Sequence, residues 1–201
     1  MKVIGLCGGS GSGKGTVAGI FSEFDIPSID TDEVYHNLII QKSPCLDALV
    51  KEFGVGILAS DGSLDRKKLS EIVFLGENSA EKRRSLNQIS HKFVLEKTRE
   101  ILDNYRVQGK KAALVDAPLL FESGFDKECD FVIAVIANEN IRMMRIVKRD
   151  KIPMKNAKLR IRTQLPDEYL SANSKFTIKN DGSISDLRTS VKAIADEILN
   201  S

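Results

Sequence analysis

The chain has 201 residues, which suits one domain with a sizeable core or a core that carries insertions. Apolar residues make up 42%, charged residues 29%, and the formal net charge is +2. This ordinary globular balance excludes bulk electrostatic attraction to nucleic acid or to a membrane surface. No apolar run reaches the length of a membrane span, and the first strand pattern starts too early to leave room for a signal peptide.

The three cysteines, Cys7, Cys45 and Cys129, are odd in number, far apart and in no metal-binding spacing. Cys7 and Cys129 lie in or beside apolar strand patterns, so we expect them to be small buried side chains. Unpaired cysteines of this kind predict a reduced, cytoplasmic protein.

The first predicted strand, residues 3–7, leads through a glycine-rich turn into a helical pattern at residues 17–21. The turn consists of Gly8, Gly9, Ser10, Gly11, Ser12, Gly13 and Lys14, followed by Gly15 and Thr16. Strand, glycine-rich turn and helix in this order predict a phosphate-binding P-loop, with Lys14 reaching the outer phosphates. A flexible turn is the bland alternative, which Lys14 and the two flanking elements disfavour. The P-loop pattern asks for Ser or Thr directly after the lysine; here Gly15 stands there and the hydroxyl comes at Thr16.

A short apolar strand, residues 26–29, is followed by Asp30, Thr31 and Asp32 and then by a helical pattern. In open α/β sheets ligands gather past the carboxyl ends of the strands, which puts both carboxylates beside the P-loop if the two strands are near neighbours. Capping of the helix by Asp30 or Thr31 is the alternative, but a cap needs one such residue and there are two carboxylates.

Strand patterns are missing from Gln41 to about Tyr105. Residues 46–53, 66–74 and 80–102 have helical spacing, separated by Gly54, by Asp61-Gly62 and by Gly76-Glu77-Asn78. A crossover helix needs only about a dozen residues, so this helical insertion is predicted to form a wall of the substrate site. His91 lies in the last of these helices, where a lone histidine is more often structural.

Residues 111–116 return to the sheet and end in Asp116, an arrangement similar to a Walker-B strand whose carboxylate sits near the metal. Pro118 ends this strand, because it has no N–H. Residues 131–137 are apolar on both faces, as in a central parallel strand. Residues 176–179 form a last strand, a turn follows at residues 180–182, and an amphipathic helix ends the chain.

Residues 139–162 are strongly basic, and Arg142, Arg145 and Arg149 recur at helical spacing, so they are expected to share a face. A solvated basic face is one interpretation, and an RNA-binding patch, which here lacks the interleaved aromatics that stack bases, is another. Near a P-loop, we favour arginines that close over the nucleotide and neutralise charge on the transferring phosphoryl group.

These patterns predict an α/β, three-layer P-loop kinase fold with a mostly parallel sheet, in one domain over residues 1–201. A helical substrate insertion is expected at about 33–108 and a basic helical lid at about 138–174. Two carboxylates after the second strand, the helical insertion and the late arginine-rich segment suggest a small-molecule kinase. A GTPase would be expected to carry an Asn-Lys-x-Asp motif for base specificity, which this sequence lacks.

At this level the sequence resembles the dephospho-coenzyme A kinase family. The matching residues run along nearly the whole chain: 8–14, 29–32, 64–69, 72–74, 86–91, 116–122, Arg145, 148–150, Arg160, Ile161, Gln164 and 180–182. The run Pro-Leu-Leu-Phe-Glu and the Ile-Asp-x-Asp turn are far more restrictive than the P-loop alone. Departures from the family pattern are Gly15 for serine, Lys92 for proline, Arg142 for glutamine, and Ser174-Lys175 for Ala-Asp.

The resemblance implies ATP as phosphate donor, Mg²⁺, and dephospho-CoA as acceptor, in a monomer or weak homo-oligomer without nucleic acid or membrane. It implies Asp32 as general base and Lys14, Arg145 and Arg149 as phosphoryl-stabilising groups. The implied nucleotide contacts are residues 9–16 and Asn180. The implied acceptor contacts are Asp32, Arg66, His91, Leu119, Phe121 and Glu122. Because Mg²⁺ usually keeps several waters, we expect the ATP phosphates and waters to hold it, with Asp32, Asp116 and Thr16 as the metal-side residues reached through water.

Two rival hypotheses stay open at this stage. Nucleoside monophosphate kinases of the adenylate kinase type share the Gly-Lys-Gly-Thr ending of the P-loop, but would carry Thr-Gly-Asp-x-Leu-Arg where this chain has residues 30–35. A non-catalytic nucleotide-binding regulator is the other rival, disfavoured by the intact Lys14, Asp32, Arg145 and Arg149.

Overall fold

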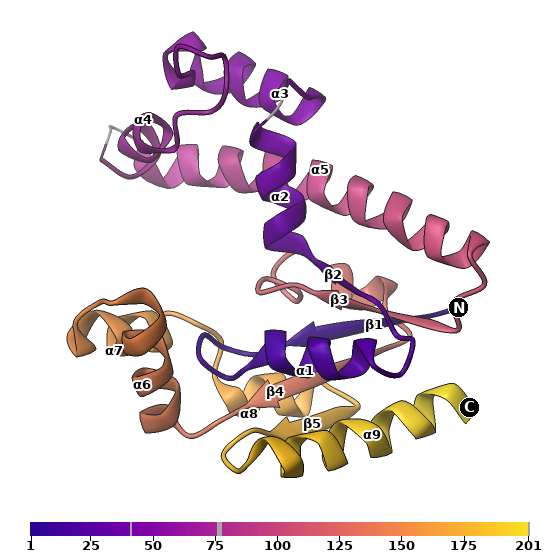
Figure 1. Cartoon of the computed structure of the whole chain (residues 1–201). Helices are drawn as coiled ribbons and strands as arrows, with labels where there is room; N and C mark the ends of the chain where they lie inside the picture. Colours follow the sequence, from indigo (N-terminus) through magenta and orange to yellow (C-terminus); the bar gives the residue numbers. More distant parts are fainter. Residues whose placement is uncertain (41, 76–77, 201) are drawn as a thin grey trace. The chain divides into compact units, whose positions relative to one another are not determined.

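The computed structural model describes residues 1–40, 42–75 and 78–200, and the chain divides into two compact units (Figure 1). Unit 1 combines Met1–Asp30 with Leu102–Ser201, and unit 2 is the single stretch Thr31–Ile101. Of the expected separator at residues 76–78, Gly76 and Glu77 lie outside the described residues, as does Gln41. No helix among the described residues is long and apolar enough to cross a membrane.

Unit 1 is built on a five-stranded sheet in which all neighbouring strands are parallel. The strands are β1 (Lys2–Cys7), β2 (Ser28–Asp30), β3 (Ala112–Asp116), β4 (Phe131–Ile136) and β5 (Phe176–Lys179), in the order β2-β3-β1-β4-β5. The mostly parallel sheet predicted from the apolar strand patterns is therefore confirmed.

The strand order corrects one expectation about the carboxylates. β2 does not pair with β1, because β3 lies between them. In register, Leu6 of β1 lies opposite Asp116 of β3, and Asp116 lies opposite Asp30 of β2. The acid nearest the end of β1 is therefore Asp116.

Helices of unit 1 bury apolar stripes against this sheet. α1 (Lys14–Ser22) and α9 (Ile184–Asn200) pack on each other and share one core with the strands, in which Phe21, Leu114, Ile133 and Val191 are fully buried. The remaining helices of this unit are α6 (Glu139–Asp150), α7 (Met154–Arg162), α8 (Asp167–Ala172) and the short η3 (Phe125–Glu128).

Unit 2 is helical, as its sequence pattern predicts, with one isolated bridge between Leu58 and Leu64. Its elements are α2 (Thr31–Ile40), α3 (Pro44–Phe53), η1 (Val55–Ile57), α4 (Arg66–Ser70), the π-helical η2 (Glu71–Leu75) and most of α5 (Ser79–Val107). Ser43 and Asp65 cap α3 and α4 by accepting hydrogen bonds from backbone N–H groups. Its own core contains Ile39, Cys45, Leu49, Ile57, Leu69 and Val73.

Most differences from the predicted bounds are small. The strand expected at residues 26–29 is observed at Ser28–Asp30, and the helix expected from residue 17 already begins at Lys14. Of the cysteines, Cys7 is buried as expected, whereas Cys129 is only half-buried.

Candidate active site

The glycine-rich loop between β1 and α1 has the backbone that a phosphate nest needs. Gly11 and Gly13 have φ of 79° and 97°, in the left-handed region that favours glycine, and Gly13 is the N-cap of α1. A Cβ atom at Gly11 would meet the carbonyl of Arg142, and one at Gly13 would overlap the Asn180 amide. Both the dihedral angles and the close packing therefore require glycine.

Lys14 stands at the start of α1 with its ammonium group beside the loop. Its Nζ donates a hydrogen bond to the carbonyl of Gly8 at 3.2 Å and lies 3.6 Å from Oδ1 of Asp116. Asp116 is buried at the end of β3, and the two side chains are only 14% and 12% exposed. A cation held at the mouth of a nest of N–H groups fits the phosphates of a nucleotide.

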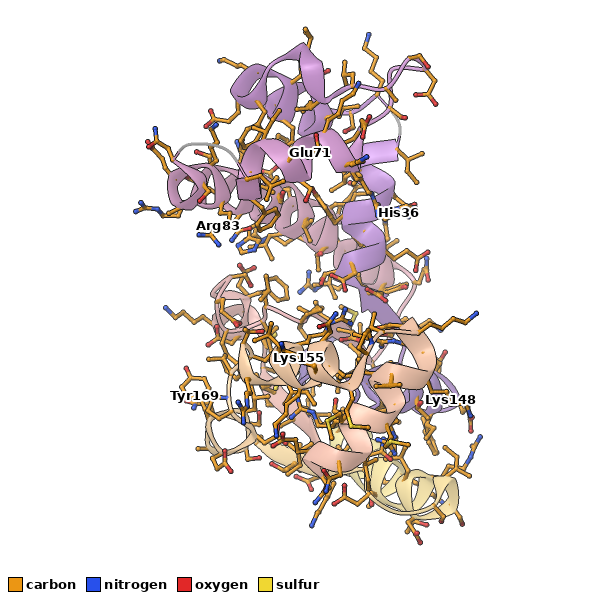
Figure 2. The ribbon with its side chains drawn as sticks, turned by 90° about the vertical axis from the view of Figure 1, so that its left-hand side faces the viewer. His36, Glu71, Arg83, Lys148, Lys155 and Tyr169 are labelled. Atoms are coloured by element: carbon orange, nitrogen blue, oxygen red, sulfur yellow. The ribbon has the colours of Figure 1, made fainter. Side chains whose placement is uncertain are left out.

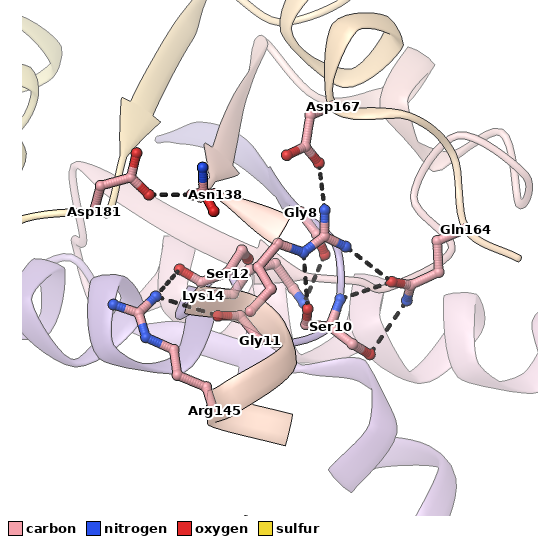
Figure 3. A network of polar contacts seen from close by, with 11 residues as sticks. Gly8, Ser10, Gly11, Ser12, Lys14, Asn138, Arg145, Gln164, Asp167 and Asp181 are labelled. Carbon is pink, nitrogen blue, oxygen red and sulfur yellow. Dashed lines mark hydrogen bonds and ion pairs between the residues drawn. The ribbon is translucent and has the colours of Figure 1, made fainter. Parts of the chain in front are cut away.

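Arg145 and Asn180 both donate hydrogen bonds to the loop, and Figure 3 shows those of Arg145 to Gly11 and Ser12. Arg145 Nη1 donates to the carbonyls of Gly11 and Ser12 at 3.2 and 3.3 Å, and its Nη2 donates to the carbonyl of Asn180 at 3.0 Å. The Asn180 side-chain amide donates to the Ser12 carbonyl at 2.7 Å. Both residues expected on the nucleotide side thus contact the P-loop directly.

The three arginines of α6 have the helical spacing of one face, as expected, but they do not share one environment. The side chain of Arg142 is 5% exposed, whereas that of Arg149 is 62% exposed. Arg149 Nε donates to Asp150 at 2.7 Å, and Arg160 of α7 also pairs with Asp150. Hydrogen bonds from Arg149 and Arg160 lower the pKa of Asp150 to about 2. Lys148 and Lys155 are exposed in the same basic segment (Figure 2).

The segment after β3 borders the P-loop. A hollow of about 100 Å³ is lined by the first two glycines of the loop and by this segment, together with the linker between α7 and α8. Its lining includes Gly8, Gly9, Leu119, Phe121, Glu122, Thr163 and Gln164. The Phe121 ring packs edge-on against Tyr169 of α8, with ring centroids 5.6 Å apart. Leu119 is 45% exposed, so it is available to a ligand.

The expected site residues of unit 2 lie on three of its helices. Asp32 is exposed in the first turn of α2, and His91 is half-buried within α5. Arg66 is exposed at the start of α4, where its guanidinium contacts Nδ1 of His36 on α2 (Figure 2 shows His36).

The structure also assigns contacts to two residues for which the sequence suggested no role. Gln164 and Asp167 both bond to the Arg142 guanidinium, and Gln164 also bonds to Ser10 of the P-loop. The side chains of Arg142, Gln164 and Asp167 line a second, open cavity of about 500 Å³ at the ends of β4 and β5. One signal was available: Arg142 stands four residues before the buried Ile146 on α6, so the two share the inward face of that helix.

A parallel sheet with a P-loop, a partly buried Lys–Asp pair beside the loop and arginines on α6 that contact the loop define a P-loop kinase. Residues 2–186 match the family model described as Dephospho-CoA kinase. The chain therefore belongs to the dephospho-CoA kinase family, and it is a phosphotransferase.

Curated relatives agree over the whole chain. The Dephospho-CoA kinase of Bacillus anthracis is 38% identical over 192 residues, covering 96% of this chain and 94% of the relative. That of Corynebacterium glutamicum is 36% identical over 198 residues, covering 98% of this chain and 100% of the relative.

Solved structures give the same picture. The Dephospho-CoA kinase of Campylobacter jejuni is 28% identical, with a TM-score of 0.72 over 98% of this chain and 97% of the other. TT1252 of Thermus thermophilus is 26% identical, with a TM-score of 0.80 and the same coverage. A shikimate kinase of Acinetobacter baumannii, 16% identical with a TM-score of 0.55, shares the fold.

Proposed function

We propose that this chain transfers the γ-phosphoryl group of ATP to the ribose 3′-hydroxyl of dephospho-CoA, giving CoA and ADP. The observation that carries the donor half is the P-loop with the Lys14 ammonium held beside it, 3.6 Å from Asp116. The acceptor is supported by family membership and by the exposed Leu119 next to the P-loop hollow.

On the donor side, the P-loop of residues 9–16 binds the phosphates, with the Ser10 N–H kept by Gln164, and Lys14 stabilises the charge that develops on the transferring group. Arg145 and Arg149 add positive charge to the same group. Arg149 must exchange Asp150 for phosphate to do so, since its guanidinium now bonds to that carboxylate. Asn180 supports the loop from the side of β5.

On the acceptor side, Asp32 is the general base. The 3′-oxygen attacks the γ-phosphorus, its proton passes to the Asp32 carboxylate, and the bond from the γ-phosphorus to the bridging oxygen of ADP breaks. Arg66 and His91 of unit 2 contribute to binding dephospho-CoA, as do Leu119, Phe121 and Glu122 of unit 1. Unit 2, close to the expected insertion 33–108, is the acceptor side, and α6 to α8, within residues 138–174, are the lid region.

Mg²⁺ fits this site as an ion carried by the nucleotide. Among the residues that the structure describes, no group of three His, Cys, Asp or Glu side chains could hold a metal alone. Magnesium usually keeps several waters and binds phosphates, and it would neutralise charge on the β- and γ-phosphates here. Asp32 or Asp116 would hold the ion through its waters, and the exposed Thr16 hydroxyl is a candidate outer contact.

The three free thiols, Cys7, Cys45 and Cys129, support a reducing compartment, for which we propose the cytoplasm. A net charge of +2 gives no bulk attraction to nucleic acid, and we propose a monomer or weak homo-oligomer without a nucleic-acid partner.

The test is a parallel assay of acceptors. The purified chain is incubated with ATP and Mg²⁺ and either dephospho-CoA, AMP, CMP or 4′-phosphopantetheine, and ADP release is measured. Turnover with dephospho-CoA alone is expected. Faster turnover with AMP or CMP would favour a nucleoside monophosphate kinase. Absence of turnover with every one of the acceptors would favour a nucleotide-binding regulator.

Asp32→Asn tests the assignment of the base, because it keeps the shape of the side chain and removes its basicity. We expect kcat to fall by roughly 10²- to 10⁴-fold while ATP still binds. Asp30→Asn is the matched control on the neighbouring carboxylate. Greater damage by the control would reverse the assignment of the two acids.

A further inference from the structure

A buried guanidinium supports the P-loop from α6, and the nucleotide chemistry proposed above does not use it. Arg142 is 4% exposed and bonds to three acceptors on three different segments. Its Nε donates to the Ser10 carbonyl at 3.0 Å, its Nη1 to Asp167 at 2.8 Å, and its Nη2 to Gln164 Oε1 at 3.2 Å (Figure 3). A Cβ atom on Gly9 would overlap this guanidinium, so the loop backbone lies directly against it.

Gln164 completes the grip on the same loop residue. Its Oε1 accepts the backbone N–H of Ser10 at 2.8 Å, and its Nε2 donates to the Ser10 hydroxyl at 3.3 Å. The backbone N–H, the carbonyl and the hydroxyl of Ser10 are therefore all bound by side chains from α6 and from the linker before α8. These partners are far from Ser10 in sequence, so the contacts come from the tertiary fold.

Burial of this cation needs a reason, since an apolar side chain could fill the same space without desolvating a charge. Asp167, whose side chain is 24% exposed, compensates the charge but does not require Arg142 to contact the loop. The planar fork of arginine, in contrast, can meet acceptors on three segments at fixed angles. The geometry of the Arg142 guanidinium therefore suits a residue that fixes the positions of the groups it bonds to.

We propose that Arg142 and Gln164 are positioning residues that hold the Ser10 peptide in one conformation, so that the P-loop is already ordered when nucleotide phosphates arrive. A loop that must order on binding loses affinity to that ordering, and a preorganised loop does not. Loss of either residue should therefore weaken binding of the phosphates and leave binding of the adenosine part nearly unchanged. This consequence rests on the proposed use of ATP, whereas the ordering of the loop does not.

The experiment compares Arg142→Gln, Gln164→Leu and their double variant with the wild type. Arg188→Gln is the matched control. Arg188 also pairs with an acid, but its side chain is 52% exposed and its partner, Glu23, lies at the C-terminal end of α1 and not in the P-loop. NMR measures hydrogen exchange of the Ser10 amide in each nucleotide-free protein. Calorimetry measures the dissociation constants of ADP and of adenosine.

The expected result is a Ser10 amide that exchanges at least about tenfold faster in all three loop variants, and an ADP dissociation constant raised about tenfold. Adenosine affinity should stay within about twofold, and the control should match the wild type. The double variant should weaken ADP binding by less than the product of the single effects, since both residues hold one peptide.

Equal weakening of ADP and adenosine, or unchanged exchange at Ser10, would show that Arg142 only stabilises the fold. If Arg142→Gln does not fold, Gln164→Leu decides alone, because it keeps the pair between Arg142 and Asp167. If the wild type binds no ADP, the proposed function is wrong, and exchange at Ser10 still decides whether these residues order the loop.

Discussion

Single positions of the P-loop differ sharply in what a side chain there would meet. At Gly11 and Gly13 an added Cβ would run into α6 or Asn180, and both residues have positive φ. At Gly15, in the first turn of α1, an added Cβ would meet nothing within 4 Å apart from its chain neighbours and the nearby backbone of its own helix. The loop therefore excludes side chains where it packs on the fold, and it tolerates one at the position where P-loops usually carry a hydroxyl.

Lys14→Ala should lower kcat on the order of 10²-fold or more, because it removes charge that stabilises the transferring phosphoryl group. Urea unfolding should show that the fold is intact. The control is Lys110→Ala, which removes a surface lysine that likewise pairs with an aspartate, Asp25. Near-normal kcat in Lys14→Ala would contradict the P-loop assignment.

Gly15→Ser should fold normally and lower the Mg²⁺ concentration needed for half-maximal rate, because the new hydroxyl stands directly after the lysine. Thr16 cannot replace it, since one step along a helix turns the side chain by about 100°. A magnesium titration of kcat in wild type, Gly15→Ser and Thr16→Val measures this. Thr16→Val should lose less activity than Asp32→Asn, and an equal loss would assign Thr16 to the metal directly.

Some residues of the candidate site could be predicted because the strand and turn patterns next to them in the sequence mark their positions. Lys14 and Asp116 are marked by the strands and turns around them, and the structure brings them within 3.6 Å of each other. Arg142 was predicted to act with Arg145 and Arg149, since their spacing is helical. Its burial depends on Gln164 and Asp167, which join it only through the tertiary fold. Sequence spacing cannot show such a contact.

Among the elements, α6 does the most varied work. Over two turns, Arg142 bonds to the Ser10 carbonyl and Arg145 bonds to the Gly11 carbonyl of the P-loop. Arg149 bonds to Asp150 near solvent. Successive arginines at i, i+3 and i+7 diverge because their long side chains reach different partners. Arg142 is buried, Arg145 is half-buried, and Arg149, with a side chain 62% exposed, is the most accessible of the three.

Arg149→Ala should lower kcat more than it raises the KM for dephospho-CoA, because the partner of Arg149 in the reaction is charge on the nucleotide. Steady-state kinetics with both substrates varied will show this. Arg160→Ala is the matched control, since Arg160 pairs with the same Asp150 from α7. A change confined to the KM of dephospho-CoA would place Arg149 in an acceptor wall.

Element types were predictable where apolar periodicity is long. The helical run over residues 80–102 is seen as Ser79–Val107, and the apolar run 131–137 as β4, Phe131–Ile136. The helix expected over 66–74 is split into α4 and a π-helical turn, because a change in helical hydrogen bonding leaves no mark in apolar spacing.

At the level of the whole molecule, the order of the strands was beyond reach of the sequence. Nothing in the apolar runs shows that β3 inserts between β1 and β2. The consequence reaches the site, because it is this order that sets Asp116 between Leu6 and Asp30.

The buried thiols predict how stability depends on alkaline pH. Burial raises the pKa of Cys7 and of Cys45 to about 11, and that of Cys129 to about 12, from 9.0. Above pH 9 the unfolded chain releases protons that the folded chain keeps, so stability is full below pH 9 and falls as pH rises from 9 towards 11. Urea midpoints at pH 8 to 11 measure this.

The control for the alkaline series is Cys129→Ser, which lacks the thiol with the largest shift and should give a shallower fall. Burial also raises the pKa of Tyr35, which adds to the slope in all variants. A urea midpoint that does not change between pH 9 and 11 in the wild type would contradict the buried state of these thiols.

The strand order also bears on the making of the protein. Both neighbours of β1 come from beyond residue 110, β3 at Ala112–Asp116 and β4 at Phe131–Ile136, so β1 has no strand to pair with until more than half the chain exists. Unit 2 is one uninterrupted stretch and can form its core sooner. At roughly 5–20 residues per second, the apolar β1 waits several seconds on the ribosome with both edges open. That interval is when the nascent chain is most exposed to aggregation, and when a chaperone that covers apolar strands would matter most.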